Sequence, residues 1–216
     1  LILVVVLGGR LGYVFFYNFS YYIAHPLEIP AIWSGGMSFH GACLTLLIGG
    51  WIFCRRNKLD YWKTADIYIA TLPIGLGLGR IGNFINGELY GRATDLPWGM
   101  VFPGGGSSPR HPSQLYESFL EGFLLFVILW SVRKKPWQKK RYWPHGSILA
   151  LFLVCYGCFR TVVENFREPD QQVGFLFGLF TMGQLLSACM VACGLLVWKF
   201  RFNHTNNYLS LQRNAF

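Results

Sequence analysis

The residues best suited to chemistry are arginines, carboxylates and a histidine that lie within or beside apolar stretches of the chain. The longest group runs from residue 79 to residue 92, where two arginines, two asparagines and a glutamate occur among glycines (Arg80, Asn83, Asn86, Glu88 and Arg92). Arginine suits a phosphate because its planar guanidinium donates two parallel hydrogen bonds. Glycine lets the backbone approach a ligand closely. The run therefore predicts a site for an anionic group.

Close packing of helices is the alternative explanation for the glycines. Gly75 and Gly79 have the small-xxx-small spacing that brings membrane helices together. That spacing explains these glycines, but it leaves the two arginines, two asparagines and one glutamate unexplained. Gly77-x-Gly79-x-x-Gly82 also matches a dinucleotide-binding string, but that motif requires a preceding strand and a βαβ unit, and neither is predicted here.

A second group, Tyr156, Arg160 and Glu164, has a spacing of four, which places all three side chains on one face of a helix. Arg160 and Glu164 either neutralise each other or form part of a polar site. If they form part of a polar site, Arg160 lies at the same depth in the bilayer as Arg80. Two arginines at one depth suggest a binding site for a phospholipid head group. Arg10 is either a further member of this site or a buried structural charge.

Two shorter groups accompany these. His40 lies within residues 38–42. Histidine is the side chain whose unperturbed pKa is closest to neutral, so it can act as a general base toward a thiol, although a lone histidine near a helix start is more often an interfacial hydrogen-bonding residue. Residues 110–117 begin a predicted helix, and capping alone would explain their composition. Gln114 and Glu117, three apart, would face the same side and could brace a polar site.

The rest of the chain is strongly apolar. Hydrophobic residues make up 53% of it and charged residues only 13%. A typical soluble domain has about 25% charged residues. The net charge of +9 would suggest a nucleic-acid partner in a soluble protein. Here the charges lie between apolar runs, which favours the bilayer. The chain opens at Leu1 inside an apolar stretch, without an initiator Met or a signal peptide, so we expect one further span upstream.

A membrane-spanning helix needs about 20 mostly apolar residues. Six stretches meet or approach that length, which predicts an all-α, polytopic transmembrane bundle: 1–17, 38–54, 64–79, 113–132, 146–164 and 174–198. The linkers 55–63 and 133–142, with the C-terminal tail, hold 13 of the 19 Lys and Arg residues, so they are expected in the cytoplasm. The loop at 80–112 then faces outward. We expect one transmembrane catalytic domain over 1–200 and a polar cytoplasmic tail over 201–216.

The six cysteines lie in or at the ends of apolar runs. Cys155-x-x-Cys158 has the spacing of a redox motif, but it has no second pair and no βαβ context. We therefore expect these cysteines to be small buried apolar side chains. No cluster with metal-ligand spacing occurs in the sequence.

Together these motifs resemble the prolipoprotein diacylglyceryl transferase family. Residues 79–92 are similar to the family's Gly-Arg-x-Gly-Asn-Phe-x-Asn-x-Glu signature. His40-Gly41 is similar to its His-Gly-Gly element, with Ala42 in place of the second glycine. Residues 111–117 and 156–164 are also family-like, and the similarity covers about 8–200.

The resemblance implies a bacterial inner-membrane transferase with several spans. In its reaction a lipobox cysteine thiol of a prolipoprotein attacks the phosphate-bearing glycerol carbon of phosphatidylglycerol; a thioether forms and glycerol phosphate leaves. The resemblance implies Arg80 and Arg160 on the lipid phosphate and His40 as the candidate base. It implies no metal or organic cofactor. The expected substrate-binding residues are Arg80, Asn83, Asn86, Glu88, Gly91, Tyr156 and Glu164.

Two functions of other classes are alternatives to this one. A transporter or flippase for an anionic lipid would use the same arginines, but it predicts inverted halves, which the sequence does not show. A non-catalytic membrane scaffold has no need to gather Arg80, Glu88, Arg160 and Glu164 at one depth. The run at 79–92 favours the transferase over both.

Overall fold

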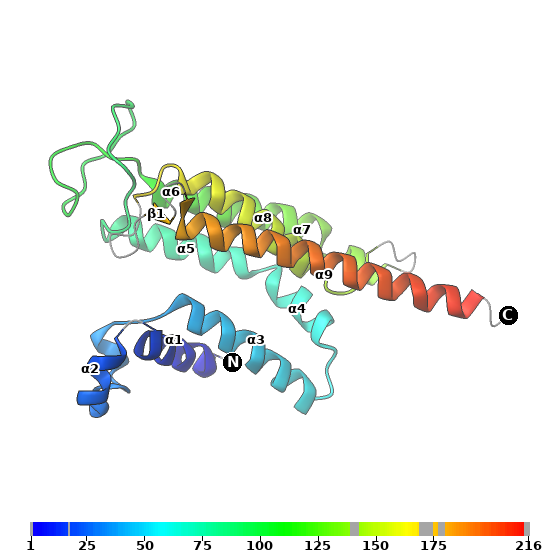
Figure 1. The fold of residues 1–216 in the computed structure, drawn as a ribbon. Helices are drawn as coiled ribbons and strands as arrows, with labels where there is room; N and C mark the ends of the chain where they lie inside the picture. The colour runs from blue at the N-terminus through cyan, green and yellow to red at the C-terminus, as the bar shows by residue number, and fades with distance from the viewer. Residues whose placement is uncertain (1, 17, 139–142, 169–174, 177–179, 214–216) are drawn as a thin grey trace. The chain divides into compact units, whose positions relative to one another are not determined.

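The computed structural model describes residues 2–16, 18–138, 143–168, 175–176 and 180–213, and helices dominate it (Figure 1). The chain divides into two compact units, residues 1–64 and 65–216, and each is described by itself. The only strands in the described ranges are two residues long, β1 (Phe175–Leu176) and β2 (Phe180–Thr181), paired antiparallel. The predicted all-α class is confirmed.

The first unit is built on two packed helices, α1 (Ile2–Phe16) and α3 (Phe39–Arg56). They are joined through α2 (Phe19–Ala24) and two 3₁₀ turns, η1 (Pro26–Glu28) and η2 (Ile32–Ser34). Glycines allow the close contact, since a Cβ added to Gly12 would lie 2.7 Å from the Cα of Gly41. The hydroxyl of Ser38 caps α3 by accepting from the Gly41 amide at 3.2 Å.

Arg10 has a structural role in this unit. Its side chain is 3% exposed and donates to the backbone carbonyls of Glu28 and Ile29, each at 2.8 Å, and to those of Gly35 and Gly36. The guanidinium also lies 5.1 Å from the centre of the Tyr22 ring. Of the two alternatives for Arg10, the buried structural charge is the one that the structure supports.

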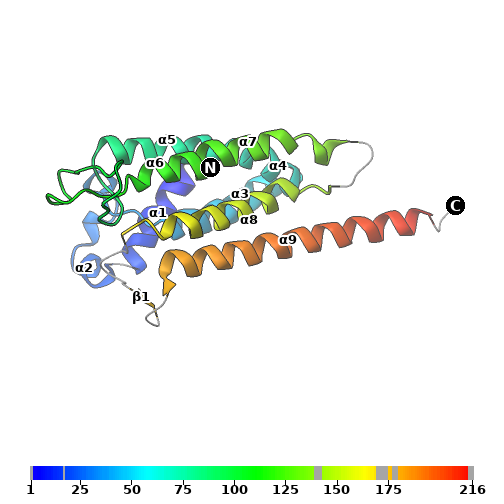
Figure 2. The same cartoon turned by 90° about the horizontal axis from the view of Figure 1, so that it is seen from above.

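The second unit contains the remaining helices, with α4 (Tyr61–Ile69) crossing the boundary between the units. α5 (Leu72–Ile85) leads into the long loop, and the chain re-enters the bundle through α6 (Ser113–Glu117), the π-helical segment η3 (Ser118–Leu124) and α7 (Leu125–Val132). A 3₁₀ turn, η4 (Lys135–Trp137), precedes α8 (Ser147–Glu164), and α9 (Met182–Arg213) packs along α8 (Figure 2).

The core of the second unit lies between α7 and α8. Its fully buried members include Leu125 and Leu129 of α7 and Ile148 of α8. The start of α8 is fixed by the carboxylate of Asp66, which accepts from the amides of Gly146 at 2.7 Å, Ile148 at 3.0 Å and Leu149 at 3.1 Å. A carboxylate at this position satisfies otherwise unpaired helix-start amides and complements the helix dipole.

Three helical stretches in the described part of the chain are long and apolar enough to cross a membrane: Ser113–Trp137, Ser147–Glu164 and Gly183–Asn203. Ile2–Phe15 is a shorter apolar helix. The predicted span over 64–79 is not one uninterrupted helix, because α4 ends at Ile69 and α5 begins at Leu72 with Pro73 in its first turn. Proline has no amide hydrogen, so it suits a helix start and interrupts a continuous helix. The predicted spans over 1–17, 38–54 and 64–79 stay predictions.

The close contact between α5 and η3 is made at Gly77 and Gly122, not at the Gly75 and Gly79 that the sequence spacing indicates. A Cβ on Gly122 would lie 2.6 Å from the Cα of Gly77, and the Ser118 hydroxyl donates to the Gly77 carbonyl at 3.0 Å. Gly75 and Gly79, by contrast, would place a Cβ in open space. Within this unit the close packing of α5 is therefore made by Gly77, which lies on the face that meets η3, and not by Gly75 or Gly79.

The expectation for the cysteines is only partly correct. All six are free thiols and Cys54 is buried, but Cys158, Cys189 and Cys193 are exposed on the surfaces of α8 and α9. Helices that face lipid expose apolar side chains on their outer faces, so a small apolar residue there does not have to be buried in protein.

Candidate active site

A network of buried ion pairs lies where α5, α6 and α8 meet, and Glu117 is its centre. One carboxylate oxygen of Glu117 lies 2.5 Å from Nε of Arg80. The other oxygen lies 3.1 Å from a guanidinium nitrogen of Arg160 and 3.2 Å from one of Arg167. The Glu117 side chain is 1% exposed, so its charge is held away from water and depends on these three cations.

The predicted face of α8 forms the second part of the network. Arg160 also pairs with Glu164, one turn further on, at 3.0 Å, and Glu164 accepts a hydrogen bond from the Thr181 hydroxyl at 2.9 Å. Tyr156 is buried on the same helix, with its ring stacked on Phe152. Arg160 and Glu164 thus do neutralise each other, as one alternative held, but Arg160 also reaches the carboxylate that holds Arg80.

Glu121, in the π-helical segment, is the least engaged carboxylate of the network. It is 1% exposed, its nearest cation in the described residues is Arg160 at 3.8 Å, and neither of its oxygens accepts a hydrogen bond there. Buried carboxylates are costly unless they are paired. π-Helical segments are rare and occur often at functional sites. We therefore add Glu121 to the candidate site, because it is buried, carries a carboxylate and lies in the π-helical segment.

The residues after Arg80 fix the start of the long loop. Asn83 and Asn86 donate to the same carboxylate oxygen of Glu88, at 2.9 and 3.3 Å. Gln114, at the start of α6, donates to the Glu88 carbonyl at 2.7 Å. Glu88 and Asn86 are exposed and Asn83 is half-buried, so this polar cluster lies at the surface of the unit beside the buried network.

Gly91 is required by its backbone surroundings. Its amide donates to the carbonyl of His111 at 2.9 Å, and a Cβ at this position would overlap the carbonyl oxygen of Phe166. The next amide, from Arg92, donates to that same Phe166 carbonyl at 2.9 Å. These hydrogen bonds attach the loop to the segment just after α8. That segment includes Arg167, whose guanidinium contacts Glu117 of the network.

His40 is the second residue of α3, so it lies in the first unit, whereas Arg80 and Arg160 lie in the second. The orientation of its side chain falls outside the described part of the structure. Its neighbour Gly41 has a packing role against α1, which explains a glycine at that position of the motif. The role of His40 stays a prediction.

The structure brings Arg80, Arg160 and Glu164 into one network, with Asn83, Asn86, Glu88 and Gly91 organising the adjacent loop. Sequence reasoning missed two members, Glu121 and Arg167. Glu121 had a usable signal, because it is a carboxylate inside a predicted span and such residues are functional candidates by default. Glu117 was expected only to brace the site, together with Gln114. Arg167 could not be found in this way, because it lies after the predicted span over 146–164 and not inside it.

The network contains three arginines and three carboxylates, so its formal charge is balanced. Arg80 is its most accessible cation, with 22% of its side chain exposed. An arriving phosphate could take donors from Arg80 and Arg160 because both already converge on one carboxylate. No group of three or more potential metal ligands occurs among the described residues. Fold and site thus define a helical membrane protein with a buried network of arginines and carboxylates.

Comparison with known proteins identifies the family. The family model for prolipoprotein diacylglyceryl transferase matches residues 1–200. A relative from Desulfotalea psychrophila, named phosphatidylglycerol–prolipoprotein diacylglyceryl transferase, is 63% identical over 211 residues, which cover 98% of this chain and 78% of the relative. Proteins of the same name from Geobacter sulfurreducens and Pseudomonas aeruginosa are 56% and 52% identical, over 88% and 91% of this chain and 71% and 73% of their own lengths.

The chain belongs to the prolipoprotein diacylglyceryl transferase family, and it is a bacterial membrane transferase. The family expected from residues 79–92 is confirmed.

Proposed function

We propose that this chain transfers the diacylglyceryl group of phosphatidylglycerol to the lipobox cysteine of prolipoproteins. Its relatives are named phosphatidylglycerol–prolipoprotein diacylglyceryl transferase, which supports the donor, the acceptor protein and the group transferred. The sulfur forms a thioether with the glycerol carbon, the carbon–oxygen bond to the phosphate breaks, and the electron pair of that bond leaves with glycerol phosphate. The reaction requires a site for a phosphodiester, access for a peptide thiol and a group that accepts the thiol proton.

The observation that carries the proposal is the convergence of Arg80 and Arg160 on Glu117, at 2.5 and 3.1 Å. Donors held in place before the reaction stabilise charge as it develops on the leaving group, and they do so best where water is excluded. In the proposed complex the phosphate takes donors from both arginines. Glu117 keeps its contact with Arg167, so the carboxylate does not lose every partner when the lipid binds.

The other site residues are assigned to holding the head group and the loop. Asn83, Asn86 and Glu88 form one hydrogen-bonded cluster, and Gly91 attaches the loop behind it. Glu164 orients Arg160 from the side away from Glu117, with Tyr156 one turn earlier on α8. His40 is the proposed base, because a thiol with a pKa near 8.5 is a poor nucleophile until it is deprotonated.

We further propose that the chain crosses the bacterial inner membrane six times, with its C-terminus and basic linkers in the cytoplasm. The distribution of Lys and Arg supports that orientation. In this topology residues 1–200 form the catalytic domain and residues 201–216 a cytoplasmic tail. Residues 201–213 continue α9 as a helix.

The test uses the intact protein in proteoliposomes with phosphatidylglycerol and a synthetic lipobox peptide. Glycerol phosphate release and the mass of the peptide are followed for the wild type and for Arg80→Ala, Arg160→Ala and His40→Ala. Arg133→Ala is the control, because Arg133 stacks on Trp130 at the far end of its span.

We expect diacylglyceryl-modified peptide from the wild type and the control, and none from either site-arginine variant. Loss of activity in His40→Ala would support His40 as the base, and full activity would show that His40 is not the base. A folded wild type that binds phosphatidylglycerol but leaves the thiol unmodified would refute the transferase and favour a lipid transporter.

A further inference from the structure

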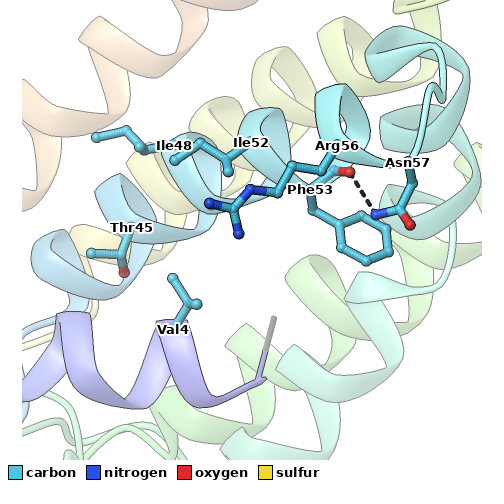
Figure 3. A pocket seen from close by; sticks show the side chains of 8 residues that line it. Val4, Thr45, Ile48, Ile52, Phe53, Arg56 and Asn57 are labelled. Atoms are coloured by element: carbon cyan, nitrogen blue, oxygen red, sulfur yellow. Dashed lines mark hydrogen bonds between the residues drawn. The ribbon is translucent and has the colours of Figure 1, made fainter.

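A second lipid site is suggested by a groove in the first unit. The groove has a volume of about 350 Å³. Ligand pockets typically have volumes of roughly 300–1,000 Å³. Val4 of α1 lines one side, and residues of α3 and the position after it line the other (Figure 3): Thr45, Ile48, Gly49, Ile52, Phe53, Arg56 and Asn57.

The polar side chains of the groove are satisfied, with one exception. The hydroxyl of Thr45 donates to the Gly41 carbonyl at 2.9 Å, and the side-chain amide of Asn57 donates to the Phe53 carbonyl at 2.8 Å. Arg56 has no hydrogen-bond or ion-pair partner within the described residues, and Figure 3 shows its guanidinium reaching back over the groove instead of extending away from it. An apolar groove with one unpartnered cation suits a ligand that is apolar along its length and anionic at one end.

The neighbouring arginine differs in this respect. The Arg55 guanidinium lies 5.0 Å from the centre of the Trp51 ring, so it has an aromatic partner and does not line the groove. Trp beside Arg at a helix end is typical of a membrane–water interface. In the proposed topology the cationic end of the groove therefore lies at the level of the lipid head groups.

The position along α3 separates this groove from the proposed chemistry. Arg56 follows His40 on the same helix, and their separation in sequence corresponds to about 24 Å at roughly 1.5 Å per residue. The hydrocarbon core of a bilayer is about 30 Å thick. In the proposed topology His40 and Arg56 therefore lie near opposite surfaces of the membrane.

We propose that this groove binds an anionic phospholipid, with an acyl chain against Val4 and Ile52 and the head-group phosphate at Arg56. The lipid is a bound, unreacted component, held on the side of the membrane opposite His40. Its binding is independent of the transferase reaction, because none of the groove residues belongs to the catalytic network.

The experiment counts lipids bound to the intact protein by native mass spectrometry. Detergent-solubilised protein is titrated with dioleoyl phosphatidylglycerol or dioleoyl phosphatidylcholine, which have the same acyl chains and differ in head-group charge. Arg56→Gln removes the proposed phosphate contact, and Ile52→Trp fills the groove from an exposed position. Arg55→Gln is the matched control, since it removes a charge from the same helix end without altering the groove.

We expect Arg56→Gln to weaken one phosphatidylglycerol-binding event about fivefold, the effect of one arginine near a membrane surface, with phosphatidylcholine unaffected. Ile52→Trp is expected to abolish that event, and Arg55→Gln to keep it. Transferase turnover at saturating phosphatidylglycerol stays within about twofold of wild type in Arg56→Gln. Wild-type lipid counts and affinities in both groove variants, or equal loss of both lipids, would overturn the proposal.

Discussion

Replacing Glu117 with glutamine removes one negative charge from the centre of the arginine network and keeps the size of the side chain. The three arginines around it would then face only two carboxylates, Glu121 and Glu164, so the formal charge of the network changes from zero to +1. Arg160 keeps its contact with Glu164 at 3.0 Å. Arg80 loses its single ionic partner among the described residues, and Arg167 loses its ion pair with Glu117 as well.

The size of the effect follows from burial. Removing one partner of a buried ion pair costs about 3–5 kcal/mol of stability. A displacement of about 1 Å in a positioning group can reduce a rate about 10²-fold. We therefore expect kcat of Glu117→Gln to fall about 100-fold, which corresponds to roughly 2.7 kcal/mol of activation free energy. The KM for phosphatidylglycerol should not rise, because a network with charge +1 attracts an anion more strongly than a neutral one.

The assay measures initial rates of peptide modification over a range of phosphatidylglycerol concentrations, with thermal unfolding followed in the same detergent. Glu168→Gln is the matched control: Glu168 pairs with Arg110 at 2.6 Å, but 41% of its side chain is exposed, so its loss should change kcat less than about twofold. If Glu117→Gln keeps both kcat and KM within about twofold of wild type while Arg80→Ala is inactive, Glu117 does not position the arginines.

Three other substitutions test the supports of the site. Gly183→Ala places a Cβ 2.5 Å from a carboxylate oxygen of Glu164, so activity should fall about tenfold as Glu164 shifts from Arg160. Gly91→Ala overlaps a backbone carbonyl behind the loop and should reduce peptide modification at least about tenfold, with a lower melting temperature. Asp66→Asn weakens the carboxylate cap of α8. Loss of a helix cap typically costs about 1 kcal/mol of stability, and thermal unfolding of this variant should show a loss of that order.

Each of these variants has a control in the same chain. Gly75→Ala adds a Cβ in open space on α5, so it should leave activity and melting temperature unchanged. Asp60→Asn alters an exposed carboxylate that accepts from the Lys63 amide at 2.9 Å, and its effect should be smaller than that of Asp66→Asn. If Gly183→Ala behaves as wild type, Glu164 does not need its present position against Arg160. If Gly91→Ala behaves as wild type, the close approach of Gly91 does not support the loop. Equal effects of Asp66→Asn and Asp60→Asn would contradict the role of Asp66 as the cap of α8.

The part of the site that could be predicted came from periodicity and from the cost of charge in a membrane. A spacing of four placed Arg160 and Glu164 on one face of α8, and the structure joins them by an ion pair. Arg80 was selected as a charge at the end of an apolar run. The same argument applied to Glu121 would have found it, because it too lies inside a predicted span.

The remaining features depend on packing that local sequence does not determine. Arg167 reaches Glu117 only because the chain turns beyond α8. The π-helical segment Ser118–Leu124 lies within an ordinary apolar run, and its contact with Gly77 of α5 appears only in the folded unit. The break between α4 and α5 did have a local signal, Pro73, which lies inside the predicted span over 64–79.

The arginine network also bears on how the chain enters the membrane. Glu117 and Glu121 belong to one apolar helical stretch, Ser113–Trp137. An acidic residue at the centre of a spanning helix costs about 2.5–3.5 kcal/mol on insertion. Arg80 is synthesised before this stretch and Arg160 after it, so the members of the ion-pair network come from different insertion events. A helix that pairs with α5 as it leaves the translocon enters the bilayer with one of its charges already matched. We therefore expect the insertion of neighbouring helices to be cooperative, with the charges of the network contributing to which helices associate.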